Sequence, residues 1–430
     1  MLSPVKIGIE IEYLVSQDER PIESGYLCGF ASKKACLGLA VLESAAREID
    51  PHARMEYSRG TRRWVFRNGS FLIPDSFSLL ETVTAPSCRL DDLCEQLWML
   101  KRGLIAGAAQ HGCQISGAAC PVSYRFDDME FAFGRRCNNA GMHVHLDAAT
   151  DSAKQVYCSI LMPIIPELIA MSANSPIHNR KETWACSYRL QVSPMAKTRK
   201  MLLHDPERFR ESRAQSREDR YEFLTPFSRS NKTVEIRGMD TPMNIDWAMA
   251  FAAFLQCLAT RVQRIADSRD MPARQPFDLS RLEENSSVAV GRGIQAGFSF
   301  SERHLPWHCD GSHPLWRGRD MPYPVKDGRL SARKSIGNLL ACIEEDARLL
   351  DAEQFLQHLY KMVETGINQA EQQRIWMARG GFEFYMEKLQ EMMARPPDTL
   401  LQRTKGSDTM HPLKRKSGNS LQESEAIYGN

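Results

Sequence analysis

The chain has 430 residues, of which 43% are hydrophobic and 25% are charged, so it can bury a large core and is predicted to be globular. Its formal net charge of +2 and its pI of about 8.0 indicate neither a nucleic-acid partner nor an anionic membrane surface. Twelve cysteines without a Cys-x-x-Cys pair, and no apolar run long enough for a bilayer, predict a cytoplasmic protein with reduced thiols rather than a secreted or membrane protein.

The first predicted element is a strand over residues 8–13, in which two glutamates alternate with isoleucines. Glu10 and Glu12 share one face of such a strand, while Ile9 and Ile11 share the other. The apolar face can pack on helices, and carboxylates that project together are oxygen ligands of the kind that divalent cations bind. Alone, such a pair is more typical of a solvated face, so the strand indicates a metal site only in combination with others.

A second strand is predicted at residues 80–86, and it contains one acidic residue, Glu81. Apolar residues at helical spacing then predict a helix over residues 91–111, which Gly112 ends. A short strand at residues 114–116 follows. The Glu81 strand thus leads into a helix that can pack on the sheet.

Two histidines at i and i+2, His143 and His145, lie in residues 138–147 and project from one face of a predicted strand. Such a pair can point at one ligand, and histidine nitrogens are common metal ligands. The preceding residues 125–136 predict a loop rich in Asp, Phe and Arg. This loop either closes over a site or is a plain connector.

Residues 233–240 repeat the same spacing, because Glu235 and Arg237 alternate with Val234 and Ile236. If the polar faces of the three strands lie on one sheet, they bring carboxylates, imidazoles and a guanidinium into one cavity. Carboxylates hold a divalent cation, and arginine holds phosphate. The combination therefore predicts a site for a divalent cation bound to phosphate oxygens.

The segment between these strands is basic, with 13 Lys or Arg against 7 Asp or Glu in residues 180–232. A site that holds phosphate groups needs cations near them, and Arg180, Arg189 and Arg229 are the candidates. Residues 206–220 mix both signs and are interpreted as a solvated helix instead.

The remaining elements are mostly helical. Residues 245–267 predict a long helix whose broad apolar face packs in the core. Residues 291–297 are rich in glycine, but the preceding strand at 288–290 is meagre and no acidic partner follows, so a dinucleotide-binding loop is rejected. Helices at 335–353 and 368–393 complete the fold, and the polar residues 395–430 predict a disordered tail.

A further group of potential metal ligands lies in one short segment. Its members are His304, His308, Cys309, Asp310 and His313. Their spacing fits no familiar closed zinc site, and the prolines and tryptophans around them favour an ordered loop. The role of this loop stays open.

The three strand motifs, in this order, resemble the glutamine synthetase-like carboxylate–amine ligases, including the glutamate–cysteine ligase and amidoligase branches. These motifs are Glu-x-Glu, Gly-Met-His-Val-His, and Val-Glu-Ile-Arg followed by Asp. Residues 68–75, leading to Glu81, also resemble the strand that brings another metal-binding glutamate in these families and in the Pup ligases. The resemblance implies an α+β fold with a largely antiparallel, curved sheet, helices packed on its outer face, and one catalytic domain over residues 1–394.

Residue roles follow from the resemblance, motif by motif. It implies that His145 contacts the phosphate of the nucleotide and that Arg237 stabilises the transferring phosphoryl group. The implied cofactors are ATP and Mg²⁺, and mixed nitrogen and oxygen ligands also permit Mn²⁺. The implied metal ligands are Glu10, Glu12, Glu81, His143 and Glu235.

The implied reaction is ATP-dependent amide formation through an acyl phosphate. The donor is expected to be a glutamate-like carboxylate, and the acceptor an amino acid, an amine or a peptide; a homo-oligomer is left open. In residues 285–296, Ser287 and Gly291 stand where the family usually has tryptophan and arginine. A specialised amidoligase is therefore at least as consistent with the sequence as an enzyme of glutathione synthesis.

Two alternatives remain open at this stage. An amide hydrolase related to the Pup ligase and deamidase branch would use the same metal site, and residues 68–75 resemble that branch. A non-catalytic protein that binds a nucleotide or a peptide is the second alternative. Loss of a metal ligand would be its expected sign, whereas every expected carboxylate and histidine is present.

Overall fold

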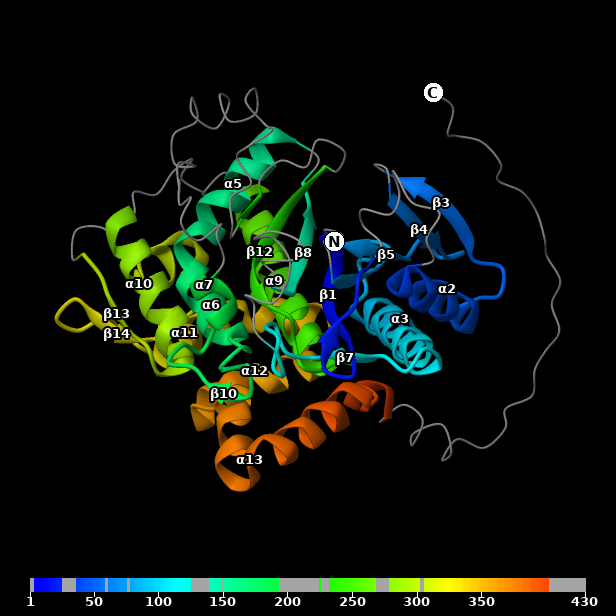
Figure 1. The fold of residues 1–430 in the computed structure, drawn as a ribbon. Coiled ribbons are helices and arrows are strands. Elements are labelled where there is room, and N and C mark those ends of the chain that lie inside the picture. The colour runs from blue at the N-terminus through cyan, green and yellow to red at the C-terminus, as the bar shows by residue number, and fades with distance from the viewer. Residues whose placement is uncertain are drawn as a thin grey trace, which may run out of the picture.

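The computed structural model describes residues 4–24, 36–58, 61–75, 78–124, 139–148, 150–192, 224–225, 232–267, 278–301 and 305–401. In this part of the chain a ten-stranded sheet forms, with the order β11-β12-β8-β1-β6-β5-β4-β3, and with β2 and β7 also paired to β1 (Figure 1). All of these pairings are antiparallel, which confirms the predicted sheet type. The strands are β1 Ile7–Gln17, β2 Arg20–Pro21, β3 Arg54–Ser58, β4 Thr61–Val65, β5 Phe71–Asp75, β6 Leu79–Val83, β7 Gln114–Ser116, β8 Gly141–Asp147, β11 Leu224–Thr225 and β12 Thr233–Asp240.

Helices pack on one face of this sheet (Figure 1). Two small two-stranded sheets also form, from β9 Ile177–His178 with β10 Lys181–Glu182 and from β13 Gly297–Ser299 with β14 Arg329–Ser331. The α-helices are α2 Leu37–Ile49, α3 Leu90–Gln110, α5 Asp151–Leu161, α6 Ile165–Ser172, α7 Tyr188–Val192, α9 Ile245–Asp267, α10 Leu279–Arg292, α11 Ala332–Leu349, α12 Glu353–Thr365 and α13 Gln369–Ala394.

The apolar face of the sheet forms the centre of the core. Ile7, Ile9 and Ile11 of β1 are fully buried, and Val144 and Val234 of the neighbouring strands are equally buried. Helix α9 contacts β1 and β8, α6 contacts β12, and α3 contacts β1 and β6. The alternation of the first strand thus directs isoleucines to helices on one face and leaves the glutamates on the other.

Most of the expected helices are present. The predicted bounds of 245–267 are confirmed for α9, and 91–111 is confirmed as α3 to within one residue at each end. Pro163 and Pro166 are compatible with helix because each lies in the first turn, of the 3-10 helix Met162–Ile164 and of α6 respectively. A missing N–H in a first turn breaks no helical hydrogen bond.

Two local expectations were wrong. Residues 288–290 are not a strand but part of α10, which Asp278 caps by accepting hydrogen bonds from the backbone N–H groups of Ser280 and Arg281. The helix predicted at 335–353 ends at Leu349, and α12 begins at Glu353 after a short turn. The glycine-rich segment at 291–297 therefore begins in the last turn of a helix and does not follow a strand, which agrees with the rejection of a dinucleotide-binding loop.

Helix α2 was missed by the sequence analysis, and its packing explains why it forms. Its buried face contacts α3 closely, since a Cβ atom on Gly107 of α3 would lie 2.6 Å from the backbone of α2. A Cβ atom on Gly103 would likewise lie 2.3 Å from the Ile49 side chain. The two helices can approach this closely only because α3 carries glycines at their contact.

The predicted tail and loop fall partly or wholly outside the described residues. Residues 395–401 are described, and they pack on the core: Thr399 is buried, and the Asp398 N–H donates to Asp246 Oδ1 at 2.9 Å. This short segment therefore belongs to the folded part of the chain. Residues 402–430 and the predicted loop at 125–136 lie outside the described residues.

Within the described ranges, two segments are long and apolar enough to cross a membrane by length and composition. They are Ser152–Ser172 and Ile245–Ala266, and 83% and 100% of their most apolar windows are buried inside the fold. Burial of this extent is typical of core helices of a globular protein. Both segments pack against the sheet.

Candidate active site

The register of the sheet brings the paired polar residues of distant segments together. Glu10 of β1 lies opposite His143 of β8, and Glu12 lies opposite Glu81 of β6. On the far side of β8, His145 lies opposite Glu235 of β12. Because residues opposite each other in an antiparallel sheet share a face, these side chains form one cluster.

Two overlapping groups of potential metal ligands lie in this cluster. In the first, ligand atoms of Glu10, His145 and Glu235 all lie within 4.8 Å of one another. In the second, the same holds for Glu10, Glu81 and His143. Glu10 belongs to both groups, so it would be a ligand in either of them.

The distances within the cluster are those of ion pairs between imidazoles and carboxylates. His145 Nε2 lies 3.1 Å from Glu10 Oε1, and His143 Nδ1 lies 3.3 Å from Glu10 Oε2. His143 is also 3.8 Å from Glu12 Oε1, through Nε2, and 3.8 Å from Glu235 Oε1, through Nδ1. The second carboxylate oxygen of Glu12 accepts a hydrogen bond from the Gly141 N–H at 2.6 Å.

Burial sets the protonation of the carboxylates. Burial raises the pKa of Glu12 to about 8, Asp75 adds to the rise, and Arg189 and Arg237 oppose it. Burial and the charges of Glu10, Asp75 and Glu12 hold the pKa of Glu81 well above its usual range. Carboxylates buried this close together repel each other, so the cluster favours binding of a cation.

Glu10 behaves differently because histidines surround it. Burial alone would raise the pKa of Glu10, but hydrogen bonds to His143 and His145 outweigh it and hold the pKa well below the usual range. Burial and the nearby Arg237 lower the pKa of His143 to about 4. Glu10 is therefore an anion and His143 a neutral imidazole near neutral pH, which are the forms that bind metals.

The donor set fits a divalent cation. Within the described residues, the buried Nε2 atoms of His143 and His145 have no hydrogen-bond partner of good geometry. Buried polar atoms of this kind usually find a partner, and an imidazole nitrogen next to carboxylate oxygens can find one in a metal. Carboxylate oxygens with one or two imidazoles suit Mg²⁺ or Mn²⁺.

Arg237 lies at a bulge in β12. The register between β12 and β8 shifts between Ile236 and Met239, and bulges re-aim side chains next to functional sites. The Arg237 guanidinium forms an ion pair with Glu235, and the charges of Glu235, Glu12 and Glu10 raise its pKa against the opposing effect of burial. A permanent cation is thus placed at the edge of the carboxylate cluster.

Arg189 is a buried arginine at the end of the cluster where Glu12 lies. Its guanidinium is 3.7 Å from Asp240 and rests on Gly141, where a Cβ atom would lie 2.4 Å from Nη2. Its Nε and Nη1 atoms are buried without a hydrogen-bond partner in the described part of the chain. Arg189 therefore has hydrogen-bonding capacity left for an anion.

The other two candidate arginines are not placed at the cluster. Arg180 forms ion pairs with Glu19 and Glu383, and its guanidinium lies 4.9 Å from the centre of the Phe382 ring. None of these partners belongs to the cluster. Arg229 lies outside the described residues.

Asp75 joins the cluster although the sequence analysis did not select it. It stands two residues after Ile73, and Ile73 pairs with Glu81, so Asp75 projects from the same face. Its charge raises the pKa of both Glu12 and Glu81, which shows that it is near them. The available signal was its i+2 spacing from a residue that pairs with Glu81.

A buried hydrogen-bond network around Asp240 lies next to the site. Asp240 accepts hydrogen bonds from the Asn174 N–H and the Ser175 hydroxyl, both at 2.8 Å, and from the Ser187 hydroxyl at 2.9 Å. Burial raises the pKa of Asp240, while Arg189 and these hydrogen bonds lower it. The network links β12 to the start of α7 and holds Arg189 in place.

The histidine-rich loop forms a different kind of contact. His308 Nε2 lies 2.9 Å from Glu167 Oε1, and the Ser335 hydroxyl donates to the same oxygen at 2.7 Å. His313 accepts a hydrogen bond from the Leu315 N–H, and His304 lies outside the described residues. These contacts favour the ordered loop over a zinc site.

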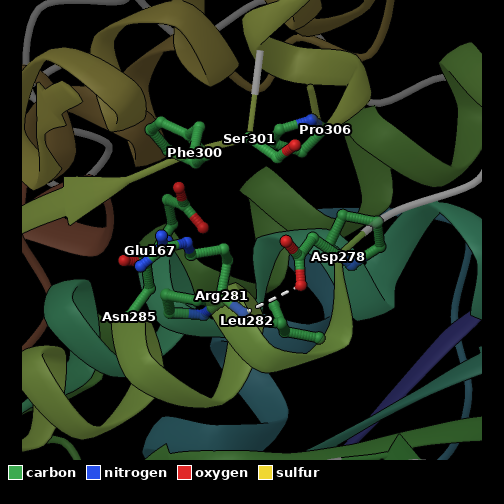
Figure 2. A pocket seen from close by; sticks show the side chains of 10 residues that line it. Glu167, Asp278, Arg281, Leu282, Asn285, Phe300, Ser301 and Pro306 are labelled. Atoms are coloured by element: carbon green, nitrogen blue, oxygen red, sulfur yellow. Dashed lines mark hydrogen bonds between the residues drawn. The ribbon is translucent and has the colours of Figure 1, made fainter. Parts of the chain in front are cut away.

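Glu167 also borders a small cavity. Figure 2 shows its carboxylate between Phe300 and Arg281, with Asn285 close by. The cavity volume is about 20 Å³, which is room for roughly one water molecule. A water there can donate to Glu167 Oε2, which has no hydrogen-bond partner within the described residues. This cavity is too small to be a substrate site.

Comparisons with known proteins place the chain in a family. Residues 77–297, more than half of the chain, match the family described as Glutamate-cysteine ligase family 2. A protein of Bradyrhizobium diazoefficiens named "Putative glutamate–cysteine ligase 2" is 25% identical over 336 residues, which cover 70% of each chain. A protein of Bordetella petrii with the same name is 30% identical over 222 residues, covering 48% of this chain and 52% of the relative.

Solved structures show the same fold at low sequence identity. A glutamate–cysteine ligase from Francisella tularensis in complex with AMP has a TM-score of 0.52 at 12% identity, covering 94% of this chain and 92% of the other. The ligase of the prokaryotic ubiquitin-like protein Pup, in complex with Pup, has a TM-score of 0.51 at 12% identity, covering 97% and 78%. Both comparisons show similarity of fold alone.

The antiparallel sheet and the two solved structures confirm the predicted fold, and the family match confirms the predicted class of carboxylate–amine ligases. The chain belongs to glutamate–cysteine ligase family 2. It is therefore an enzyme, an ATP-dependent ligase that joins a carboxylate to an amine.

Proposed function

We propose that the enzyme activates a glutamate-like carboxylate with ATP and transfers the acyl group to an amine, which gives a γ-glutamyl-type amide. The single observation that carries this proposal is the pair of metal-ligand groups that share Glu10. Divalent cations held by carboxylates would neutralise charge during transfer of a phosphoryl group, which is a recurrent use of such ligands. The names of the curated relatives support glutamate as the donor.

The cluster supplies the ligands for this chemistry. Divalent cations, with Mg²⁺ expected and Mn²⁺ also suited to the ligands, would neutralise charge on the phosphate oxygens of ATP when bound. Glu12 joins the cluster next to His143, where the Gly141 N–H holds its carboxylate. The expected ligands are Glu10, Glu12, Glu81, His143 and Glu235.

The cationic side chains then act on anionic groups. Arg237, held by Glu235 at the bulge, stabilises the phosphoryl group as it moves to the substrate carboxylate. His145 belongs to the first of the two groups, and we assign it to a phosphate oxygen of the nucleotide, with Glu10 and Glu235 as the ligands of that group. Arg189, whose Nη1 faces Asp240, offers its Nε group to a carboxylate or phosphate, at the end of the cluster where Glu12 lies.

The acyl phosphate formed in this way must react with an amine rather than with water. The amine is a nucleophile only after it loses a proton, so a carboxylate near the reacting carbon is needed. We assign this task to Asp75, which lies on the same face beyond Glu81 and is not in either group of metal ligands. The acceptor is an amino acid, an amine or a peptide, and the reaction is assigned to the cytoplasm.

The first experiment measures ADP release with Mg²⁺ and ATP across a panel of carboxylates, with glutamate first and with or without hydroxylamine. Hydroxylamine traps an acyl phosphate as a hydroxamate, so a hydroxamate that forms only with ATP supports the proposal. The matched control is Glu43→Gln, which removes an exposed carboxylate paired with Arg47.

Two results would overturn the proposal. Amide hydrolysis without ATP would identify a hydrolase that uses the same metal ligands. ATP binding without ADP release, for every donor tested, would identify a binding protein. Product analysis by mass spectrometry separates these results, because hydrolysis and ligation change the substrate mass in opposite directions.

A further inference from the structure

A second cavity is built from elements that carry none of the active-site cluster. It has a volume of about 610 Å³ and opens between the β13–β14 hairpin, α10 and the start of α11. Sites for small molecules usually have volumes of about 300–1,000 Å³. The residues that decide its character are Glu284, Phe298, Tyr323, Lys326, Arg329 and Lys334.

The charges of this cavity are unbalanced. Lys326, Arg329 and Lys334 line it, and within the described residues none of them forms an ion pair with a carboxylate. Glu284 is the one acidic lining residue, and its carboxylate is held by Arg281 at 2.5 Å. Three cations therefore face the cavity without an anionic partner, which favours an anionic ligand.

Two buried asparagines fix the backbone around the cavity. Asn285 donates to the Ser299 carbonyl and accepts from the Ser299 N–H, both at 2.9 Å. Asn338 accepts from the Tyr323 N–H at 2.9 Å and donates to its carbonyl at 2.8 Å. A side-chain amide that satisfies both groups of one residue holds the cavity wall before any ligand binds.

The Tyr323 ring is held as well. It packs on Gly337 of α11 so closely that a Cβ atom there would lie 2.7 Å from the ring. Tyr323 lines the cavity and is still 37% exposed, so a ligand can contact it. The cavity thus combines a fixed aromatic surface with three cations.

We propose that this cavity, the basic pocket, binds a small molecule that carries at least two negative charges on phosphate groups. One carboxylate would leave two of the three cations unmatched, whereas a diphosphate or a phosphate monoester offers several oxygens with more than one charge. The aromatic surface favours a ligand with a flat ring next to its phosphate. The basic pocket is separate from the proposed ATP site and takes no part in the ligation.

The experiment measures binding of inorganic pyrophosphate and of AMP to the full chain by calorimetry, with EDTA present so that metal-dependent binding at the active site is absent. The test variant is Lys326→Gln/Arg329→Gln/Lys334→Gln. The matched control is Arg20→Gln/Arg102→Gln/Arg379→Gln, which removes three exposed cations outside the pocket and gives the same net charge.

The unmodified chain and the control are expected to bind both probes, and the test variant to bind them about 10- to 100-fold more weakly. The ADP release of all three proteins should be equal without added pyrophosphate or AMP, whether or not the proposed donor is correct. Equal affinity of the test and control variants, or no binding by the unmodified chain at millimolar probe, would overturn the proposal. If the triple variant does not fold, Arg329→Gln alone gives the same comparison.

Discussion

Glu10 is the residue on which both groups of metal ligands depend, so its charge is the most direct test of the site. Glu10→Gln keeps the side-chain volume and removes the anion. We expect carboxylate-dependent ADP release to fall by about 100-fold or more, because both cations lose a charged ligand. The melting temperature without metal should fall, because Glu10→Gln removes the anion whose contacts with His143 and His145 outweigh burial and hold its pKa low.

The activity assay and a calorimetric melt of the same preparation check this prediction. Glu43→Gln is the control, because Glu43 is exposed and pairs only with Arg47 nearby. Turnover that survives in Glu10→Gln would show that the ligands lie elsewhere.

Glu12 gives a prediction that depends on pH. Burial, and secondly the charge of Asp75, raise the pKa of Glu12 to about 8 from 4.5. The folded chain therefore holds a proton on Glu12 that the unfolded chain has lost over this range of pH. Its contribution to stability is complete below about pH 4.5 and is lost as the pH rises toward about 8.

Glu12→Gln cannot lose that proton, so its melting temperature relative to the unmodified chain should rise with pH. Thermal melts in EDTA at about pH 5, 6.5 and 8.5 measure this difference. The comparison of the two proteins removes the effect of other groups that titrate in this range. A difference that stays constant with pH would mean that the pKa of Glu12 is not raised in the folded chain.

At the scale of elements, the start of β8 depends on a small residue. A Cβ atom on Gly141 would lie 2.4 Å from Arg189 Nη2 and 3.0 Å from Cζ, so Gly141→Ala displaces the guanidinium from Asp240. We expect a loss of about 1–3 kcal/mol in the free energy of unfolding, together with reduced activity. Urea titration measures the loss.

Gly297→Ala is the matched control at the start of β13, because a Cβ atom there would meet nothing within 4 Å. Its effect on the free energy of unfolding should stay within about 0.5 kcal/mol. Equal effects of the two substitutions would mean that Arg189 does not occupy the space above Gly141.

The strands of the site could be predicted because alternation is a local pattern. Glu10 and His143 each lie two residues from a second polar group on the same face, and apolar residues separate them. Their pairing, by contrast, depends on contacts across more than a hundred residues. Asp75 was missed because it is a single carboxylate at the end of a short strand, without the i+2 pair of polar residues that marked the other strands. The contact of Glu167 with His308 was missed because the two residues are 141 positions apart in the sequence.

At the scale of the whole molecule, the site exists only when distant segments have folded together. Its candidate metal ligands come from β1, β6, β8 and β12, and the residues between 77 and 297 that match the family do not include β1. The family match alone therefore lacks Glu10 and Glu12. The complete sheet is needed to bring these two carboxylates to the other ligands.

The last described residues, 395–401, also contact distant parts of the fold. The Asp398 N–H donates to Asp246 at the start of α9, and the Thr399 hydroxyl lies 3.4 Å from the Cys94 sulfur of α3. A chain that ends at Ala394 loses these contacts, whereas one that ends at Leu401 keeps them. We expect the shorter chain to be less stable by about 1–3 kcal/mol, because burial and two hydrogen bonds are lost and Asp246 is left without this donor.

Urea titration of the two truncated chains measures this difference directly, because they differ only in residues 395–401. Asp246→Asn in the longer chain separates the loss of the contacts of residues 395–401 from the effect of the charge on Asp246. In this variant the amide oxygen can still accept from Asp398, but the charge that favours the protonated form of the buried Lys101 is gone. A loss of stability in the shorter chain that exceeds the loss in Asp246→Asn would show that docking of residues 395–401, and not the charge on Asp246 alone, stabilises α9 against α3. Equal stability of the two truncated chains would mean that this segment does not dock.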